Sequence, residues 1–205
     1  MIKLKKCKFG QRKVKFLGHT IGTDGLRTDP ENIKKIINCP VPTDVTGVRK
    51  FMGLCNYYRK FIKDLSKLSK PLRQLLKKDI KFFWEPKEQE TFEKLKRILT
   101  KAPVLLFPNF DKSFRLCTDA SLKGLEAVLE QEDENGNLRP VVYASRSLTP
   151  AEKNYHTTDL ECLAIIWSVQ HFHKYLINKP FKIFTDHSAL KSLQKITELT
   201  GRRAR

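Results

Sequence analysis

The sequence contains no long apolar run, no internal repeat and no low-complexity segment. A membrane-spanning helix needs about 18 or more consecutive apolar residues, and no segment approaches that length. The lysines within residues 1–6 are followed by no apolar stretch, so the start lacks the pattern of a secretory signal. We therefore expect no membrane association and no export.

Cysteine is infrequent, and no two cysteines have the Cys-x-x-Cys spacing of a zinc site. Their number is odd and their positions are scattered, which argues against a disulfide framework. Reduced thiols in an intracellular protein are the simplest interpretation. The five cysteines are Cys7, Cys39, Cys55, Cys117 and Cys162.

Acidic residues are also scarce, and the imbalance is local. The 205 residues include 40 Lys and Arg against 22 Asp and Glu, a formal charge of +18. Residues 1–100 hold 25 basic and 10 acidic side chains, whereas residues 101–205 hold 15 and 12. This asymmetry predicts a polyanion-binding half joined to a half with another task. A hydrophobic content of 40% argues against a wholly disordered chain.

The first half reads as a short extended region followed by helices. β-rich residues and the turn at 22–25 predict a hairpin or small sheet within residues 3–27. Capping residues, apolar residues at three- and four-residue steps, and prolines then predict a series of helices. We expect these helices over 28–38, from residue 44 onward, over 66–77 and from residue 85 onward.

The second half changes to a strand pattern. Strands are expected over 113–119, 127–131, 141–144 and 181–185, with a hairpin turn at 134–137. A helix expected over 158–176 is apolar on nearly every side and should be buried against a sheet. The fold class predicted is α/β, or α+β overall: a small helical domain followed by a mixed β-sheet domain with a buried helix.

Three acidic residues occupy unusual positions. Asp119 and Asp186 each follow an apolar strand, and Glu161 lies early in the buried helix. Burying a charged carboxylate costs roughly several kcal/mol of folding free energy unless it is paired or binds a metal. Three converging carboxylates would suit hard divalent cations. Two Mg²⁺ ions about 4 Å apart could activate a water and stabilise the leaving oxygen of a phosphodiester.

Each acid also has an ordinary structural alternative. Asp119 could belong to a turn that ends a strand, and Asp186 could cap a short helix. Glu161 lies three residues after Thr158, which is the spacing of a capping box. The ordered combination of strand Asp, helix Glu and strand Asp is more specific than any one of them.

The motifs around these acids resemble the RNase H domain of gypsy-type LTR retrotransposon polyproteins. The segments that carry the resemblance are 117–121, 143–148, 152–155, 161–166 and 185–190. Upstream segments resemble other parts of the same polyprotein. Residues 16–19 are similar to the end of the reverse-transcriptase palm, 51–62 to the thumb, and 83–84, 92–96 and 102–105 to the segment that joins thumb and RNase H.

The resemblance implies four parts of the chain and a nuclease activity. These parts are 1–27 (the palm end with the primer-grip hairpin), 28–78 (the thumb), 79–110 (the connecting segment) and 111–205 (an RNase H-like domain that is incomplete at its C-terminus). Asp119, Glu161 and Asp186 would be catalytic and would hold two Mg²⁺ ions, with Mn²⁺ as a substitute. The domain would cut the RNA strand of an RNA–DNA hybrid.

The resemblance also implies nucleic-acid contacts by the first half of the chain. The partners expected are a template–primer duplex and an RNA–DNA hybrid, bound through their phosphates by basic side chains. In the second half of the chain, His187 is a further candidate for a phosphate contact, with an ordinary surface histidine as its alternative. The nucleic-acid-binding candidates of the first half are Phe16, Leu17, Gly18, His19, Arg49, Lys50, Arg59 and Lys60. For the four cations among them, a solvated helix face is the alternative.

The chain departs from the family pattern in three ways. The paired aspartates of the polymerase are absent, so palm and fingers are expected upstream, and this chain alone should not polymerise DNA. The fourth RNase H acid, the rest of that domain and an integrase are expected downstream. Glu126 stands where the family usually has glycine, and could crowd the hybrid or add charge beside the metals. An inactive remnant that only binds nucleic acid is the alternative function. The compartment expected is the cytoplasm or a particle, with the nucleus as a further location.

Overall fold

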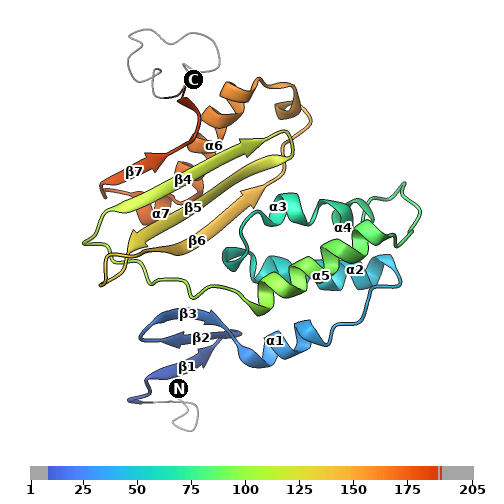
Figure 1. The fold of residues 1–205 in the computed structure, drawn as a ribbon, viewed down its shortest axis with the longest axis horizontal. Coiled ribbons are helices and arrows are strands. Elements are labelled where there is room, and N and C mark those ends of the chain that lie inside the picture. The colour runs from blue at the N-terminus through green and yellow to red at the C-terminus, as the bar shows by residue number, and fades with distance from the viewer. Residues whose placement is uncertain (1–8, 189, 191–205) are drawn as a thin grey trace, which may run out of the picture.

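The computed structural model describes residues 9–188 and 190. It has a three-stranded sheet, a group of helices and a four-stranded sheet with helices on one face (Figure 1). The predicted mixture of helix and sheet, with an RNase H-like sheet, is confirmed. No helix in the described part of the chain is long and apolar enough to cross a membrane. The outer ends of the first and last predicted parts, 1–8 and 191–205, lie outside the described residues.

The predicted hairpin is present as an antiparallel meander. Its first turn is Leu17-Gly18, and both residues have positive φ, 44° and 65°. The positive φ of Gly18 favours glycine, and an added Cβ would also come within 2.9 Å of the Tyr57 hydroxyl and the Asn32 amide. The strands are β1 (Lys13–Phe16), β2 (His19–Gly22) and β3 (Gly25–Thr28).

Three predicted helices are confirmed at their capping residues. The Asp29 side chain accepts a hydrogen bond from the N–H of Glu31, and Asp44 accepts one from Gly47. A capping box between Glu85 and Glu88 begins the third helix. These helices are α1 (Pro30–Ile37), α2 (Val45–Tyr57) and α5 (Pro86–Thr100).

The single helix predicted over 66–77 is wrong. The segment forms two short helices, α3 (Leu65–Leu68) and α4 (Lys70–Gln74), separated at Ser69. Pro71 lies in the first turn of α4, where its missing N–H costs no hydrogen bond, and it cannot continue an earlier helix. A short 3₁₀ helix, η2 (Arg59–Phe61), connects α2 to this region.

One apolar core joins α1, α2, α4 and α5, and we call these elements with η2 and α3 the helical unit. Phe92, Leu95 and Leu99 of α5 are fully buried in the same core as Phe51 and Leu72. The connecting segment predicted over 79–110 therefore contains a helix that packs inside the helical unit. The backbones of Leu26 and Leu105 also pair, which ties β3 to the end of this segment.

The four-stranded sheet has the order β6-β5-β4-β7, and with α6 and α7 it forms the sheet unit. β4 pairs antiparallel with β5 and parallel with β7. In Figure 1, α6 and α7 lie behind the sheet, and α3 lies beside the edge strand β6. The strands are β4 (Phe114–Ser121), β5 (Gly124–Glu132), β6 (Leu138–Arg146) and β7 (Phe181–Phe184).

The long helix predicted over 158–176 is shorter and less buried than expected. It is divided at Phe172 into α6 (Thr157–His171) and α7 (His173–Leu176), preceded by η3 (Glu152–Asn154). Leu160 and Ala164 are buried, whereas Ile166 is 47% exposed. The helix covers the sheet with one face, and its apolar residues on the other face remain accessible.

Candidate active site

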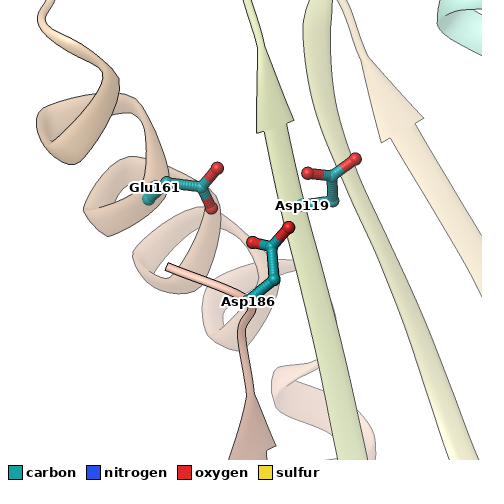
Figure 2. Close-up of side chains that lie close together, drawn as sticks. All are labelled: Asp119, Glu161 and Asp186. Atoms are coloured by element: carbon teal, nitrogen blue, oxygen red, sulfur yellow. The ribbon is translucent and has the colours of Figure 1, made fainter. Parts of the chain in front are cut away.

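The sheet unit brings the three predicted acids together at one end of β4. The parallel register pairs Cys117 with Phe184, so the chain leaving β7 runs beside the last residues of β4. Asp186 follows the end of β7, Asp119 lies within β4, and Glu161 is in the second turn of α6. One carboxylate oxygen from each residue lies within 4.8 Å of the other two. Figure 2 shows the three side chains pointing toward one another from these separate elements.

Glu161 is the buried member of the group, and its environment disfavours its charge. Its residue is only 4% exposed, whereas Asp119 and Asp186 are exposed. Burial, followed by the nearby charges of Asp119 and Asp186, raises the pKa of Glu161 to about 7. A hydrogen bond from the backbone N–H of Ala120 acts in the opposite direction. The other oxygen, Oε2, is buried with no hydrogen-bond partner in the described structure.

The capping-box alternative for Glu161 is wrong. Helix α6 begins at Thr157, and the residue before it, His156, is in the capping position, so Thr158 is inside the helix. Glu161 therefore turns its carboxylate to the end of β4 instead of to the start of its own helix.

The donor set fits a hard divalent cation. Two oxygens bonded to one Mg²⁺ at about 2.1 Å lie up to about 4.2 Å apart. The observed spread of 4.8 Å is close to that value, so small side-chain movements suffice. All the ligand atoms are carboxylate oxygens, and the Glu161 carboxylate carries a buried oxygen without a donor. A cation would supply the missing partner and cancel the mutual repulsion.

His187 lies next to this group but has a protein partner. Its Nε2 and the Oγ1 of Thr158 form a hydrogen bond of 3.0 Å, and its backbone N–H donates to Thr185. Thr158 lies one turn before Glu161 on α6. The imidazole thus joins the segment after β7 to the beginning of α6, and its contact with phosphate stays a prediction.

Glu126 is covered by a residue that the sequence analysis did not single out. Glu126 of β5 is 7% exposed and faces Asp64, the residue before α3. Burial, then a hydrogen bond with Asp64, raises the pKa of Glu126 to about 8. A protonated Glu126 donates to Asp64, whereas two ionised carboxylates would both lack a donor. No local pattern around Asp64 could have revealed this contact, because it forms between two units.

The predicted primer-grip hairpin is held by two tyrosines. The Tyr58 hydroxyl donates to the carbonyl of Gly18 over 2.8 Å and accepts from Asn32, while the Tyr57 hydroxyl donates to the carbonyl of Leu17. His19 stacks on the Tyr57 ring, and burial lowers the pKa of this histidine. The side chains of Phe16 and Leu17 are 60% and 71% exposed at the tip. Two apolar side chains are therefore presented to solvent on a fixed turn.

The four predicted cations differ in their surroundings. Arg49 and Arg59 line a cleft between the helical unit and the sheet unit. Lys50 is exposed. Lys60 is half-buried, lies 5.6 Å from the centre of the Phe61 ring, and has its pKa lowered by burial. The structure thus divides a set that the sequence presents as one.

Sequence comparisons place the chain beside retrotransposon proteins. Residues 84–183 match the model of the RNase H-like domain found in reverse transcriptase. The chain is 40% identical over 198 residues to the retrovirus-related Pol polyprotein from transposon 297 of Drosophila melanogaster, covering 96% of this chain and 18% of that protein. It is 41% identical over 187 residues to the transposon Tf2-3 polyprotein of Schizosaccharomyces pombe, covering 90% and 14%. The chain therefore spans less than a fifth of either relative.

Two solved structures of a reverse transcriptase share the fold of this chain. The foamy viral protease-reverse transcriptase in complex with an RNA/DNA hybrid matches with a TM-score of 0.78 at 22% identity, over 95% of this chain and 26% of that one. A second structure, of the foamy viral protease-reverse transcriptase dRH in complex with double-stranded DNA, matches with a TM-score of 0.76 at 21% identity, over 91% of this chain and 33% of that one. Both units described above lie within these matches.

Proposed function

Because the chain belongs to the retrovirus-related polyproteins of gypsy-type LTR retrotransposons, we propose that it supplies their RNase H-type nuclease centre and part of their nucleic-acid grip. The reaction is the Mg²⁺-dependent hydrolysis of the RNA strand in an RNA–DNA hybrid. Its catalytic residues are Asp119, Glu161 and Asp186.

The convergence of these three carboxylates carries the proposal. They come from β4, α6 and the segment after β7, and they meet within 4.8 Å. Two of the three are exposed, so a substrate phosphate can approach the group from solvent. A buried oxygen with no donor makes this arrangement unfavourable as a purely structural cluster.

The three residues would bind the cation from different sides. Asp119 and Asp186, at the exposed edge, would hold the cation where it faces the substrate. Glu161, whose pKa is about 7, would release its proton when the cation binds and so anchor the ion from the buried side. When bound, Mg²⁺ lowers the pKa of a coordinated water and stabilises charge on the leaving oxygen.

Binding of the hybrid would use the basic first half of the chain. Residues 1–100 have an excess of 15 positive charges, which suits sequence-independent contacts with phosphates. Lys50 is free to reach a backbone, and the exposed Phe16 and Leu17 could seat a strand end. The matching foamy viral enzyme was captured with an RNA/DNA hybrid, which supports this partner. Other parts of the polyprotein are further partners of the same proposal.

A cleavage assay with a matched pair of variants tests the proposal. The substrate is an RNA–DNA hybrid labelled on its RNA strand, with and without Mg²⁺. Asp119→Asn should abolish Mg²⁺-dependent cleavage, while Asp79→Asn, at an exposed aspartate outside the site, should retain it. Cleavage that persists in Asp119→Asn rejects the assignment. Tight hybrid binding without any cleavage by the unmodified chain would instead favour the alternative, a remnant that binds nucleic acid.

A further inference from the structure

A second group of charged residues lies away from the three acids, in the cleft between the helical unit and the edge strand β6. The cleft has a volume of about 400 Å³. Three arginines of the helical unit line the cleft. Arg49 belongs to α2, Arg59 to η2 and Arg73 to α4. Ser145 of β6 and His171 of α6 complete its wall on the sheet unit.

The cleft carries positive charge that nothing in its wall neutralises. None of its lining residues is acidic. Within the described residues, Arg49, Arg59 and Arg73 take part in no ion pair. The charge of Arg59 also adds to burial in lowering the pKa of His171, so the two groups are close enough to repel. The net positive charge of this wall therefore favours an anion in the cleft.

Arg73 is held in place by hydrogen bonds to Ser66 and Ser147. Its Nη2 donates to the carbonyl of Ser66 over 2.5 Å and to the Oγ of Ser147 over 2.8 Å. Its Nε is buried and has no partner in the described structure. Burial lowers the pKa of this arginine. A guanidinium held by two contacts keeps its charge at a fixed place in the cleft wall, which favours an oxyanion there.

We propose that this cleft is a binding site for a phosphate group, held by the guanidinium groups of Arg49, Arg59 and Arg73. Neutral donors are available beside them, because Asn56 and Ser145 also line the cleft. Its volume is near the lower end of the range for small-molecule sites, about 300–1,000 Å³, so it suits a compact anion. The proposal extends the nucleic-acid grip of the proposed function, in which Arg49 and Arg59 are candidates, but it needs neither the three acids nor nuclease activity.

Binding at this position would join the two units. Arg49 and Arg59 belong to the helical unit, whereas Ser145 and His171 belong to the sheet unit. An anion that contacts both walls binds only when the units are docked, so it stabilises their contact. The phosphate can come from a nucleic-acid backbone or from a free compound, and the chemistry of recognition is the same.

Calorimetry with pyrophosphate in metal-free buffer tests the site without involving the three acids. Arg49→Gln and Arg59→Gln should each weaken pyrophosphate binding at least tenfold and lower the thermal stabilisation it produces. The matched control is Lys70→Gln, which removes an exposed cation of α4 that does not line the cleft, and its affinity should change less than twofold. Both arginines are exposed, so their replacement should leave the fold intact, which circular dichroism can verify.

Two results would overturn the proposal. One is pyrophosphate binding no tighter than that of chloride at equal ionic strength. The other is the same loss of affinity in Lys70→Gln as in the two arginine variants, since that would indicate only general charge attraction. Competition with a short RNA–DNA hybrid then identifies the source of the phosphate. Displacement of pyrophosphate indicates a nucleic-acid backbone, and undiminished binding indicates a free phosphate compound.

Discussion

Asp119 and Glu126 lie directly opposite each other on β4 and β5, so two acidic side chains share one rung of the sheet. Only Asp119 is exposed, because Asp64 covers Glu126. Crowding of a substrate by Glu126, considered from the sequence, is not supported by a side chain that is 7% exposed. Its electrostatic effect on the site remains, since Asp119 contributes to the raised pKa of Glu126.

The first prediction concerns the pH dependence that Glu126 causes. Its pKa is about 8 in the folded chain, against an ordinary 4.5, so between these values the folded state keeps a proton that the unfolded state releases. Stability should therefore fall as pH rises through this window and stay low above it. Glu126→Gln should be more stable than the unmodified chain at pH 9, by about 1–3 kcal/mol, and similar to it at pH 4.5. Urea unfolding at both pH values measures this, and equal pH dependence in the two proteins would contradict it.

A second prediction concerns Mg²⁺ and Glu161. Because the pKa of Glu161 is about 7, protons compete with a cation for this carboxylate below neutral pH. Mg²⁺ should raise the melting temperature more at pH 8 than at pH 5.5. At ten times its Kd the ion should contribute about 1.4 kcal/mol. Glu161→Gln should melt at a temperature that Mg²⁺ does not change, and a full response in that variant would remove Glu161 from the metal site.

The third prediction concerns the two tyrosines that hold the hairpin. Tyr58→Phe removes the donor to Gly18 and leaves the half-buried amide of Asn32 without its acceptor, so unfolding should become easier by about 1–2 kcal/mol. Tyr57→Phe is the matched variant. Tyr57 is 50% exposed, and water can replace its hydroxyl, so the loss should be smaller. In urea unfolding, the midpoint of Tyr58→Phe should lie below that of Tyr57→Phe. The reverse order would contradict this prediction.

The fourth prediction separates the cations by their role in binding a hybrid. Lys50→Gln should reduce the slope of log affinity against log salt by roughly 0.9, the value for one lost phosphate contact. Lys60→Gln should instead lower thermal stability, because Lys60 packs over Phe61 and is half-buried. Fluorescence anisotropy over a salt series, together with melting curves, distinguishes these effects. An unchanged slope in Lys50→Gln would place that residue on a merely solvated face.

Features decided by local chemistry could be predicted from the sequence. Asp29 before Pro30, and Asp44 before Val45, carry the helix-start signal in their own side chains, and both helices begin there. The turn between β2 and β3 likewise lies between two glycines, Gly22 and Gly25, which mark it in the sequence. The order of strand Asp, helix Glu and strand Asp pointed to three acids that the structure brings together, because each is defined by the element that holds it.

Features decided by packing could not be predicted in the same way. The apolar periodicity runs without interruption through Ser69 and Phe172, where the structure ends one helix and begins another. Phe172 is buried in the core of the sheet unit, and a packing contact of this kind leaves no mark on the local pattern. Asp64 and Arg73 were missed for a related reason. Their roles exist only because the helical unit docks on the sheet, and that docking has no signature in the sequence around them.

The parallel pairing of β7 with β4 sets the moment at which the acidic centre can exist. Asp186 comes into place only after β7 has added to a sheet whose other strands precede it in the chain. A ribosome makes the chain from its N-terminus at about 5–20 residues per second. The nascent protein must therefore emerge beyond Asp186 before the three carboxylates can meet, so the proposed centre assembles only late in synthesis.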